Sequence, residues 1–193
     1  MVTPVALAEF HESVENCPFS IAAGETRRVI VGKTAVGDGA VAGSAFASGW
    51  GVGVGNGGST VFWDVATFGL ITNRSQHLVF GEFSSKFAKA AKTAPHLGAP
   101  TVITSDPGSA PVFAAEAGID LYGTPHNETS TGVAITPTRV AGADAGALMA
   151  FDATSAAGGL AVDPTQFDVY YFAPQKCFAS DGGLWFALLS PAA

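Results

Sequence analysis

The sequence predicts an α/β protein with a largely parallel sheet, and three observations lead to this fold class. From about residue 60 onward, short runs rich in β-branched and aromatic residues alternate with helix-like stretches, the rhythm of βαβ units. Apolar residues make up 48% of the chain and charged residues only 13%, as expected when strands are buried on both faces. The chain also contains 24 glycines, which suit tight turns between such strands.

The expected elements follow in chain order. Residues 60–71 (TVFWDVATFGLI) predict a helix with mostly inward-pointing apolar side chains, namely Phe62, Trp63, Ala66, Phe68 and Leu70. Residues 84–93 predict a second, amphipathic helix, and HLVFGEF at 77–83 predicts the strand between the two helices. Further strands are expected at residues 101–104, 119–122, 147–151, 169–172 and 184–189. Residues 1–58 are so rich in Gly, Ala and Ser that no element is assigned there.

The length and charge of the chain limit the classes of function. With 193 residues the chain can form one substantial core, which corresponds to one domain or part of one. The net charge of -7 and the lack of a Lys/Arg cluster argue against nucleic-acid binding, so small molecules are the expected ligands. The chain has neither a bilayer-length apolar run nor a signal-peptide pattern at its start, so we expect a cytoplasmic protein without a membrane partner.

A glycine pattern suggests a nucleotide cofactor. Gly53, Gly55 and Gly58 match G-x-G-x-x-G, the pattern of a dinucleotide-binding turn in nicotinamide-dependent oxidoreductases. Such a turn requires a clear strand before it, and the preceding segment shows no clear strand pattern. The oxidoreductase therefore remains an alternative interpretation.

The segment NGGST, which runs directly into the first predicted helix, suggests a phosphate site. Free backbone N–H groups at the helix start, together with the hydroxyls of Ser59 and Thr60, would form a cup for one anion. The structural alternative is an ordinary Ser/Thr helix cap after a glycine turn.

Two residues that follow predicted strands are candidates for cofactor chemistry. Lys176 lies in a polar turn flanked by aromatic residues, where its amine would form an imine with an aldehyde. Asp152 ends the strand ALMAF, and a protonated pyridine nitrogen would neutralise its buried charge. A surface lysine and a turn or cap aspartate are the structural alternatives.

Other candidates are less specific. Phe83 is either a face for stacking a ring or a core residue. The segment HNET at residues 126–129 is rich in donors and acceptors, but the four histidines are too dispersed to predict a metal site. Cys177, beside the lysine, is interpreted as a small buried filler rather than a reactive thiol.

Six blocks in order resemble the phosphoserine aminotransferase family, in particular its actinobacterial form. They are NGGSTVFWD, GEFSSKF, ITSDPGSAP, HNETSTG, DATSAAGG and YYFAPQKCFASDGGLW. The resemblance implies the three-layer α/β/α large domain of a fold-type-I pyridoxal-phosphate aminotransferase, with a mainly parallel sheet. We expect residues 55–193 to form this cofactor domain as an incomplete subunit and residues 1–54 to be a divergent N-terminal segment.

The resemblance also implies roles for individual residues. Lys176 corresponds to the Schiff-base lysine and Asp152 to the partner of the pyridinium nitrogen. Ser59 and Thr60 correspond to the phosphate cup. Three further cofactor contacts are implied, namely stacking by Phe83, a hydroxyl of Thr129 on the ring oxygen, and a phosphate-side contact of Gln175.

The implied reaction is amino transfer between L-glutamate and 3-phosphohydroxypyruvate, giving O-phospho-L-serine and 2-oxoglutarate in serine biosynthesis by a cytoplasmic homodimer. The chain departs from the family at four places, one of which is the stretch from Asp38 to Trp50, which does not resemble the family's helix. Arg28 is only a weak counterpart of its substrate-binding arginine, and Cys177 stands where an asparagine is expected. The chain also stops before the family's small C-terminal domain, so we expect a truncated product with weak or no activity, or a non-catalytic α/β fragment.

Overall fold

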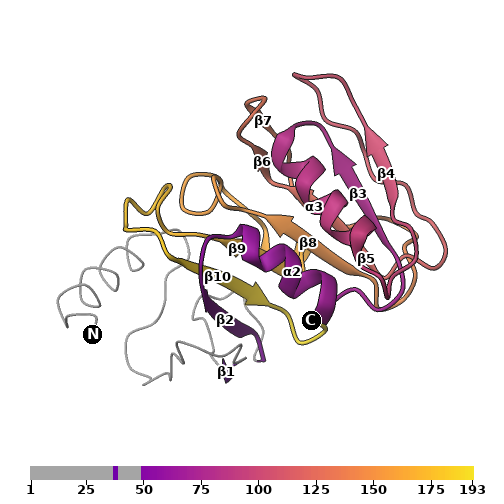
Figure 1. The fold of residues 1–193 in the computed structure, drawn as a ribbon, viewed down its shortest axis with the longest axis horizontal. Coiled ribbons are helices and arrows are strands. Elements are labelled where there is room, and N and C mark those ends of the chain that lie inside the picture. The colour runs from indigo at the N-terminus through magenta and orange to yellow at the C-terminus, as the bar shows by residue number, and fades with distance from the viewer. Residues whose placement is uncertain (1–36, 39–48) are drawn as a thin grey trace.

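The computed structural model describes residues 37–38 and 49–193 (Figure 1). Its main feature is a sheet of eight strands in the order β1-β2-β10-β9-β8-β5-β3-β4. The strands are β1 Gly37–Asp38, β2 Gly51–Asn56, β3 Ser75–Val79, β4 Thr101–Thr104, β5 Leu121–Pro125, β8 Leu148–Asp152, β9 Val169–Phe172 and β10 Leu184–Leu189. The short strands β6 Asn127–Glu128 and β7 Val133–Ala134 form a separate two-stranded ribbon.

The direction of the strands decides where their ends meet. Strands β9, β8, β5, β3 and β4 are neighbours in parallel pairs. Strand β10 is antiparallel to both β9 and β2, so β2 runs in the same direction as the parallel set. The carboxyl ends of β2, β3, β5, β8 and β9 therefore lie at one edge of the sheet, as expected for a ligand site in an open α/β sheet.

Two helices cover one face of the sheet (Figure 1). Helices α2 Thr60–Gly69 and α3 Glu82–Thr93 bury Phe62, Trp63 and Phe87 against side chains of β5, β8, β9 and β10. The Phe62 ring stacks on Tyr171 of β9, with ring centroids 4.4 Å apart. This aromatic contact fixes the start of α2 over the sheet edge where the strand ends meet.

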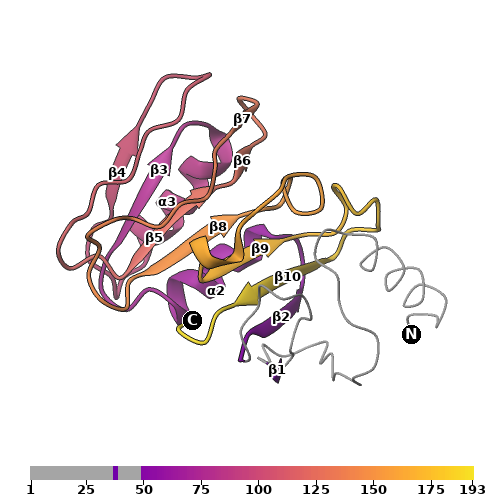
Figure 2. The same cartoon turned by 180° about the vertical axis from the view of Figure 1, so that it is seen from behind.

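The other face is covered by connections between strands (Figure 2). Its core contains Tyr122, Met149, Phe151, Phe167 and Tyr170, packed against segments that precede β5, β8 and β9. Within residues 49–193, the helical element of these segments is the 3-10 turn Pro164–Gln166. The described part is thus layered, with helices on one face and turns on the other.

The predicted mainly parallel α/β sheet is confirmed, and most predicted elements are present. Strands 101–104, 169–172 and 184–189 have the predicted bounds, while the strands predicted at 119–122 and 147–151 are shifted toward the C-terminus. HLVFGEF does not form one strand, because β3 ends at Val79 and α3 already begins at Glu82. Phe68 does not point inward, since 67% of it is exposed and it stacks on His96 instead.

Strand β2 lies in the segment where no element was assigned. It crosses the boundary proposed between residues 54 and 55 and joins the sheet through β10, and the division into two segments stays a prediction. Among the residues that the structure describes, no helix is both long and apolar enough to cross a bilayer.

Candidate active site

A pocket of about 170 Å³ opens at the edge of the sheet where the strand ends meet. It brings together all seven residues predicted to contact a cofactor, which are Ser59, Thr60, Phe83, Thr129, Asp152, Gln175 and Lys176. The topology explains this convergence, because these residues end or follow β2, β3, β5, β8 and β9, whose carboxyl ends share this edge. Arg28 lies outside the described residues.

The start of α2 forms one wall of the pocket. Gly57 has a φ of 100°, a left-handed conformation that favours glycine, and its N–H donates to the Gly183 carbonyl at 2.8 Å. Ser59 is the N-cap residue, but its side chain makes no capping hydrogen bond. The ordinary Ser/Thr cap is therefore wrong here. The N–H groups of Val61 and Phe62 donate to the carbonyls of Gly58 and Ser59 at 3.0 and 2.9 Å, so the attraction for an anion comes from the positive end of the helix dipole.

Asp152, the last residue of β8, forms the floor of the pocket. It is buried, and its Oδ1 accepts hydrogen bonds from the backbone N–H of Thr154 at 2.9 Å and from the Thr154 hydroxyl at 2.6 Å. Burial raises the pKa of Asp152 above its ordinary value, and hydrogen bonds from Thr154, Trp63 and Tyr171 only partly oppose this. No described cationic side chain pairs with Asp152. Such a carboxylate is suited to a cationic ligand.

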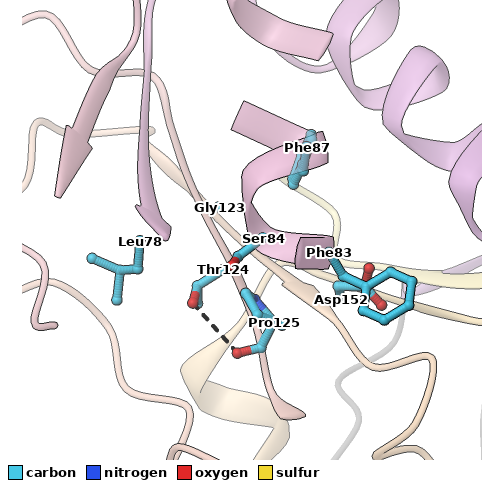
Figure 3. Close-up of a pocket in the computed structure, with 8 residues that line it drawn as sticks. All are labelled: Leu78, Phe83, Ser84, Phe87, Gly123, Thr124, Pro125 and Asp152. Atoms are coloured by element: carbon cyan, nitrogen blue, oxygen red, sulfur yellow. Dashed lines mark hydrogen bonds between the residues drawn. The ribbon is translucent and has the colours of Figure 1, made fainter. Parts of the chain in front are cut away.

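Phe83 stands at the start of α3, beside Asp152 in the lining of the pocket. Its ring is 41% exposed, so it is not a core residue, and Lys86 Nζ lies 5.5 Å from the ring centroid. Phe83 and Asp152 also line a tighter hollow between α3 and the end of β5, which has no room for a water molecule (Figure 3). Phe83 is thus a partly exposed aromatic residue in the pocket lining and a candidate for stacking on a ligand ring.

Glu128 holds the start of α3 in place through hydrogen bonds. It is completely buried, and its carboxylate accepts hydrogen bonds from the Ser84 N–H and from the hydroxyls of Ser84 and Ser130, each at 2.8 Å. Burial alone would raise the pKa of Glu128, but the hydrogen bonds from Ser84 and Ser130 hold that pKa below its ordinary value. Because Phe83 and Thr129 are the chain neighbours of Ser84 and Glu128, this contact positions both of them.

Thr129 belongs to a hydroxyl and amide cluster at the opposite wall. The Ser155 hydroxyl oxygen lies 2.8 Å from the Thr129 hydroxyl and 2.8 Å from the Asn127 side-chain nitrogen. Asn127, from the polar segment singled out in the sequence, lines the pocket, and so do four residues that sequence reasoning missed as site residues, namely Trp63, Pro125, Thr154 and Ser155. The signal for Thr154 and Ser155 was present, because they directly follow a polar strand end.

Lys176 and Gln175 lie in the turn that follows β9. Both side chains are exposed and line the mouth of the pocket. Cys177 is also exposed, with its Sγ 3.7 Å from the Ser155 carbonyl oxygen, so its interpretation as a small buried filler is wrong. Residues 175–177 of this polar turn are all exposed, so the flanking aromatic residues do not bury the thiol.

Two histidines near the site are buried and have lowered pKa values. The Nδ1 of His126 lies 2.9 Å from the Tyr170 hydroxyl, and burial lowers the pKa of His126 to about 4. The Nε2 of His77 lies 2.9 Å from the Ser75 hydroxyl, and burial lowers the pKa of His77 to about 3. Within the described ranges, no three His, Cys, Asp or Glu side chains form a group that could hold a metal ion.

The glycine pattern has a packing explanation. Gly53 and Gly55 lie inside β2, where an added Cβ at Gly55 would come within 2.4 Å of the Trp185 indole of β10. Of the three glycines in the pattern, Gly58 alone lies in the turn between β2 and α2. The glycines make room for an aromatic side chain, and the three do not form a dinucleotide-binding turn.

Comparison with known proteins identifies relatives in sequence. Phosphoserine aminotransferase from a Nocardioides species is 64% identical over 146 residues, which are 75% of this chain and 39% of that protein. Phosphoserine aminotransferase from Rhodococcus opacus is 61% identical over 145 residues, again 75% of this chain and 39% of that protein. The chain thus spans about two fifths of the length of these relatives. No protein-family model matches the chain.

Solved structures share the fold. A phosphoserine aminotransferase from Cytophaga hutchinsonii superposes with a TM-score of 0.68 at 24% identity, covering 76% of this chain and 41% of that chain. A PLP-bound phosphoserine aminotransferase from Trichomonas vaginalis gives a TM-score of 0.62 at 14% identity, covering 75% and 44%. The sheet and its two helices have the fold of a fold-type-I aminotransferase large domain, and three quarters of this chain is 61% to 64% identical to the matched part of these phosphoserine aminotransferases.

Proposed function

We propose that the pocket binds pyridoxal 5'-phosphate and that the chain provides the cofactor site of a phosphoserine aminotransferase. One observation carries the proposal, which is the presence in one pocket of an exposed lysine amine, a buried carboxylate and the N-terminus of α2. The relatives that bear this family name add support from sequence.

The chemistry of the lining residues fits this cofactor. The N-terminus of α2 suits a phosphate group, because the helix dipole favours an anion there and the Thr60 hydroxyl is a donor in the pocket lining. Asp152, whose burial disfavours its charge, gains from a protonated ring nitrogen. Phe83 offers a ring face, Thr129 a hydroxyl for the ring oxygen, and Gln175 an amide on the phosphate side.

Bound pyridoxal phosphate supplies an aldehyde for imine formation and a protonated ring that withdraws electrons. Lys176 has two tasks in the proposed reaction. With the cofactor bound, the Lys176 amine would hold its aldehyde, and Nζ, once free, would be the base that carries the proton of the substrate α-carbon to the cofactor. Asp152 would keep the ring nitrogen protonated, since its negative charge favours the cationic form.

The proposed substrates are L-glutamate and 3-phosphohydroxypyruvate, with O-phospho-L-serine and 2-oxoglutarate as products. We assign Arg28 the carboxylate of the substrate, on the strength of its sequence position alone. We also propose a homodimer that works in the cytoplasm. Light scattering on the purified protein tests the dimer, and a coupled assay for 2-oxoglutarate tests the reaction.

An absorbance scan with pyridoxal phosphate tests the central proposal. We expect a visible band that borohydride removes, leaving a stable adduct that peptide mapping assigns to residue 176. Lys176→Ala should abolish this adduct while the fold is retained, whereas Lys92→Ala, on the exposed end of α3, should leave it intact. An adduct that survives Lys176→Ala moves the imine to another lysine.

The same preparation distinguishes the alternatives. An oxidoreductase would bind NAD(P) and ignore pyridoxal phosphate, and a non-catalytic α/β fragment would bind neither. Either result contradicts the proposed function.

A further inference from the structure

Thr154 joins two parts of the pocket that are far apart in sequence. Its hydroxyl oxygen lies 2.6 Å from Asp152 Oδ1 and 2.6 Å from the hydroxyl oxygen of Ser59, which stands 95 positions earlier in the chain. Asp152 is at the end of β8 and Ser59 is at the start of α2. One side chain therefore connects the buried carboxylate to the proposed anion site.

The hydrogens in this chain of contacts are limited. Each hydroxyl has one hydrogen to donate, and an ionised carboxylate only accepts. When Asp152 is ionised, Thr154 donates to Asp152 and accepts from Ser59. The Ser59 hydrogen is then directed at Thr154, so it is not available to an anion at the start of α2.

An anion at the start of α2 would reverse the bond between Ser59 and Thr154 and break the bond between Thr154 and Asp152. If Ser59 donates to the anion, its oxygen becomes the acceptor for Thr154, and the Thr154 hydrogen turns away from Asp152. Asp152 then loses a hydrogen bond to its charged form, a loss that a cation beside it would offset.

We propose that Thr154 is a positioning residue that acts as a reversible hydrogen-bond relay, through which an anion at α2 releases Asp152 to a cationic ring. The inference rests on the proposed function. The geometry supports it from both ends, because Ser59 makes no cap bond within α2 and Asp152 has no described cationic partner. Binding of the anion and of the cationic ring should consequently be positively coupled.

The two halves of the cofactor can be offered separately, as pyridoxal and inorganic phosphate. For the unaltered chain, we expect phosphate to tighten pyridoxal binding at least about tenfold, which is about 1.4 kcal/mol and near the lower end of what a hydrogen bond to a charged group contributes. The visible band and the borohydride-stable adduct measure pyridoxal binding. Thermal unfolding with phosphate alone measures the anion site.

Thr154→Val removes the hydroxyl and keeps the shape, so the coupling should fall to about twofold or less, while both ligands still bind. Thr154→Ser restores a hydroxyl and should restore the coupling. A purely structural role would change affinity or stability without removing the coupling. Ser59→Ala breaks the relay at its other end and provides the same test if Thr154→Val does not fold.

The outcomes separate the two proposals. Coupling of equal size in the unaltered chain and in Thr154→Val or Ser59→Ala overturns the relay alone. Pyridoxal binding that is insensitive to phosphate in the unaltered chain also overturns it. Failure of pyridoxal and of pyridoxal phosphate to form any adduct overturns the proposed function and the relay together.

Discussion

Two buried carboxylates follow neighbouring parallel strands, and their surroundings differ. Glu128, after β5, accepts hydrogen bonds from Phe83, Ser84 and Ser130, and its pKa is held below the ordinary value. Asp152, at the end of β8, receives fewer hydrogen bonds, and burial raises its pKa. The hydrogen-bond acceptors of Glu128 are satisfied within the fold. Among the described residues, Asp152 has no cationic partner that stabilises its negative charge, and a cationic ligand can provide one.

Glu128 therefore has a structural role, and Asp152 has the surroundings of a ligand-binding residue. A buried charge is costly unless hydrogen bonds or an opposite charge compensate it. Glu128 receives this compensation from the N-terminus of α3, where negative charge is favoured. Asp152 lies in the lining of the pocket instead, so its compensation has to come from a molecule that enters.

The largest effect is expected for Glu128→Gln. It should lower the free energy of unfolding by about 2–4 kcal/mol, because the amide offers one acceptor oxygen and turns its own donors toward those of Ser84 and Ser130. Urea unfolding followed by circular dichroism measures the loss. Glu82→Gln is the matched control, since this exposed side chain pairs only with exposed Lys86 and should change stability by about 0.5 kcal/mol or less. A loss below about 1 kcal/mol for Glu128→Gln contradicts the structural assignment.

Asp152→Asn should weaken ligand binding much more than it changes the free energy of unfolding, the reverse of what is expected for Glu128→Gln. The amide is nearly the same size, so unfolding should change by about 1 kcal/mol or less, while affinity for pyridoxal phosphate should fall by about 1–4 kcal/mol. Titration of the visible band measures the affinity, and the same urea experiment measures stability. Unchanged affinity together with an unchanged band would return Asp152 to the role of a turn or cap residue.

Gly81→Ala tests the packing around Glu128 without replacing a carboxylate. An added Cβ would come within 2.4 Å of Glu128 Cγ and 2.5 Å of the Ser130 hydroxyl, so we expect a loss of about 1–3 kcal/mol. Gly69→Ala, at the end of α2, has nothing within 4 Å and should be neutral or slightly stabilising. Equal losses of stability for the two substitutions would contradict close packing around Glu128.

The pH dependence should be the smallest and most diagnostic effect. The folded pKa of Glu128 is lowered, so its contribution is present above about 4.5 and is lost as pH falls through the folded value. The folded pKa of Asp152 is raised, so its contribution is fully present below 3.8 and is lost as pH rises through the folded value.

Thermal unfolding of the variants should therefore show opposite trends. Relative to the unaltered chain, Asp152→Asn gains stability as pH rises from 3.8, and the deficit of Glu128→Gln shrinks as pH falls below 4.5. His77 and His126 titrate in all three proteins, so their contributions largely cancel in the differences. Parallel curves for the two variants would show that the carboxylates share one environment.

Sequence patterns predicted the elements whose local signal is strong. The strand at 169–172 is a continuous apolar and aromatic run, and the structure gives it the same bounds. Strand β2 was missed because Gly51, Gly53 and Gly55 occupy alternate positions, and its pairing depends on Trp185 in β10. The residues that explain this strand lie in its partner β10, so a sequence pattern read over neighbouring residues does not predict it.

The candidate site shows the same limit. The seven predicted cofactor contacts converge because each follows a recognisable strand or helix start. Thr154 and Glu128 were missed as functional or positioning residues, because their partners stand 95 and 44 positions away. Contacts of this kind depend on topology, and periodicity contains no information about them.

The pairing of β2 with β10 bears on the order of folding. Leu184 pairs with Asn56, more than a hundred positions earlier, and the adjoining turns contain Lys176 and the start of α2. Closing so long a loop costs chain entropy before the sheet contacts repay it, so such pairings form slowly. During synthesis the pocket cannot assemble until residue 189 has left the ribosome, and until then the edge of β9 lacks its β10 neighbour.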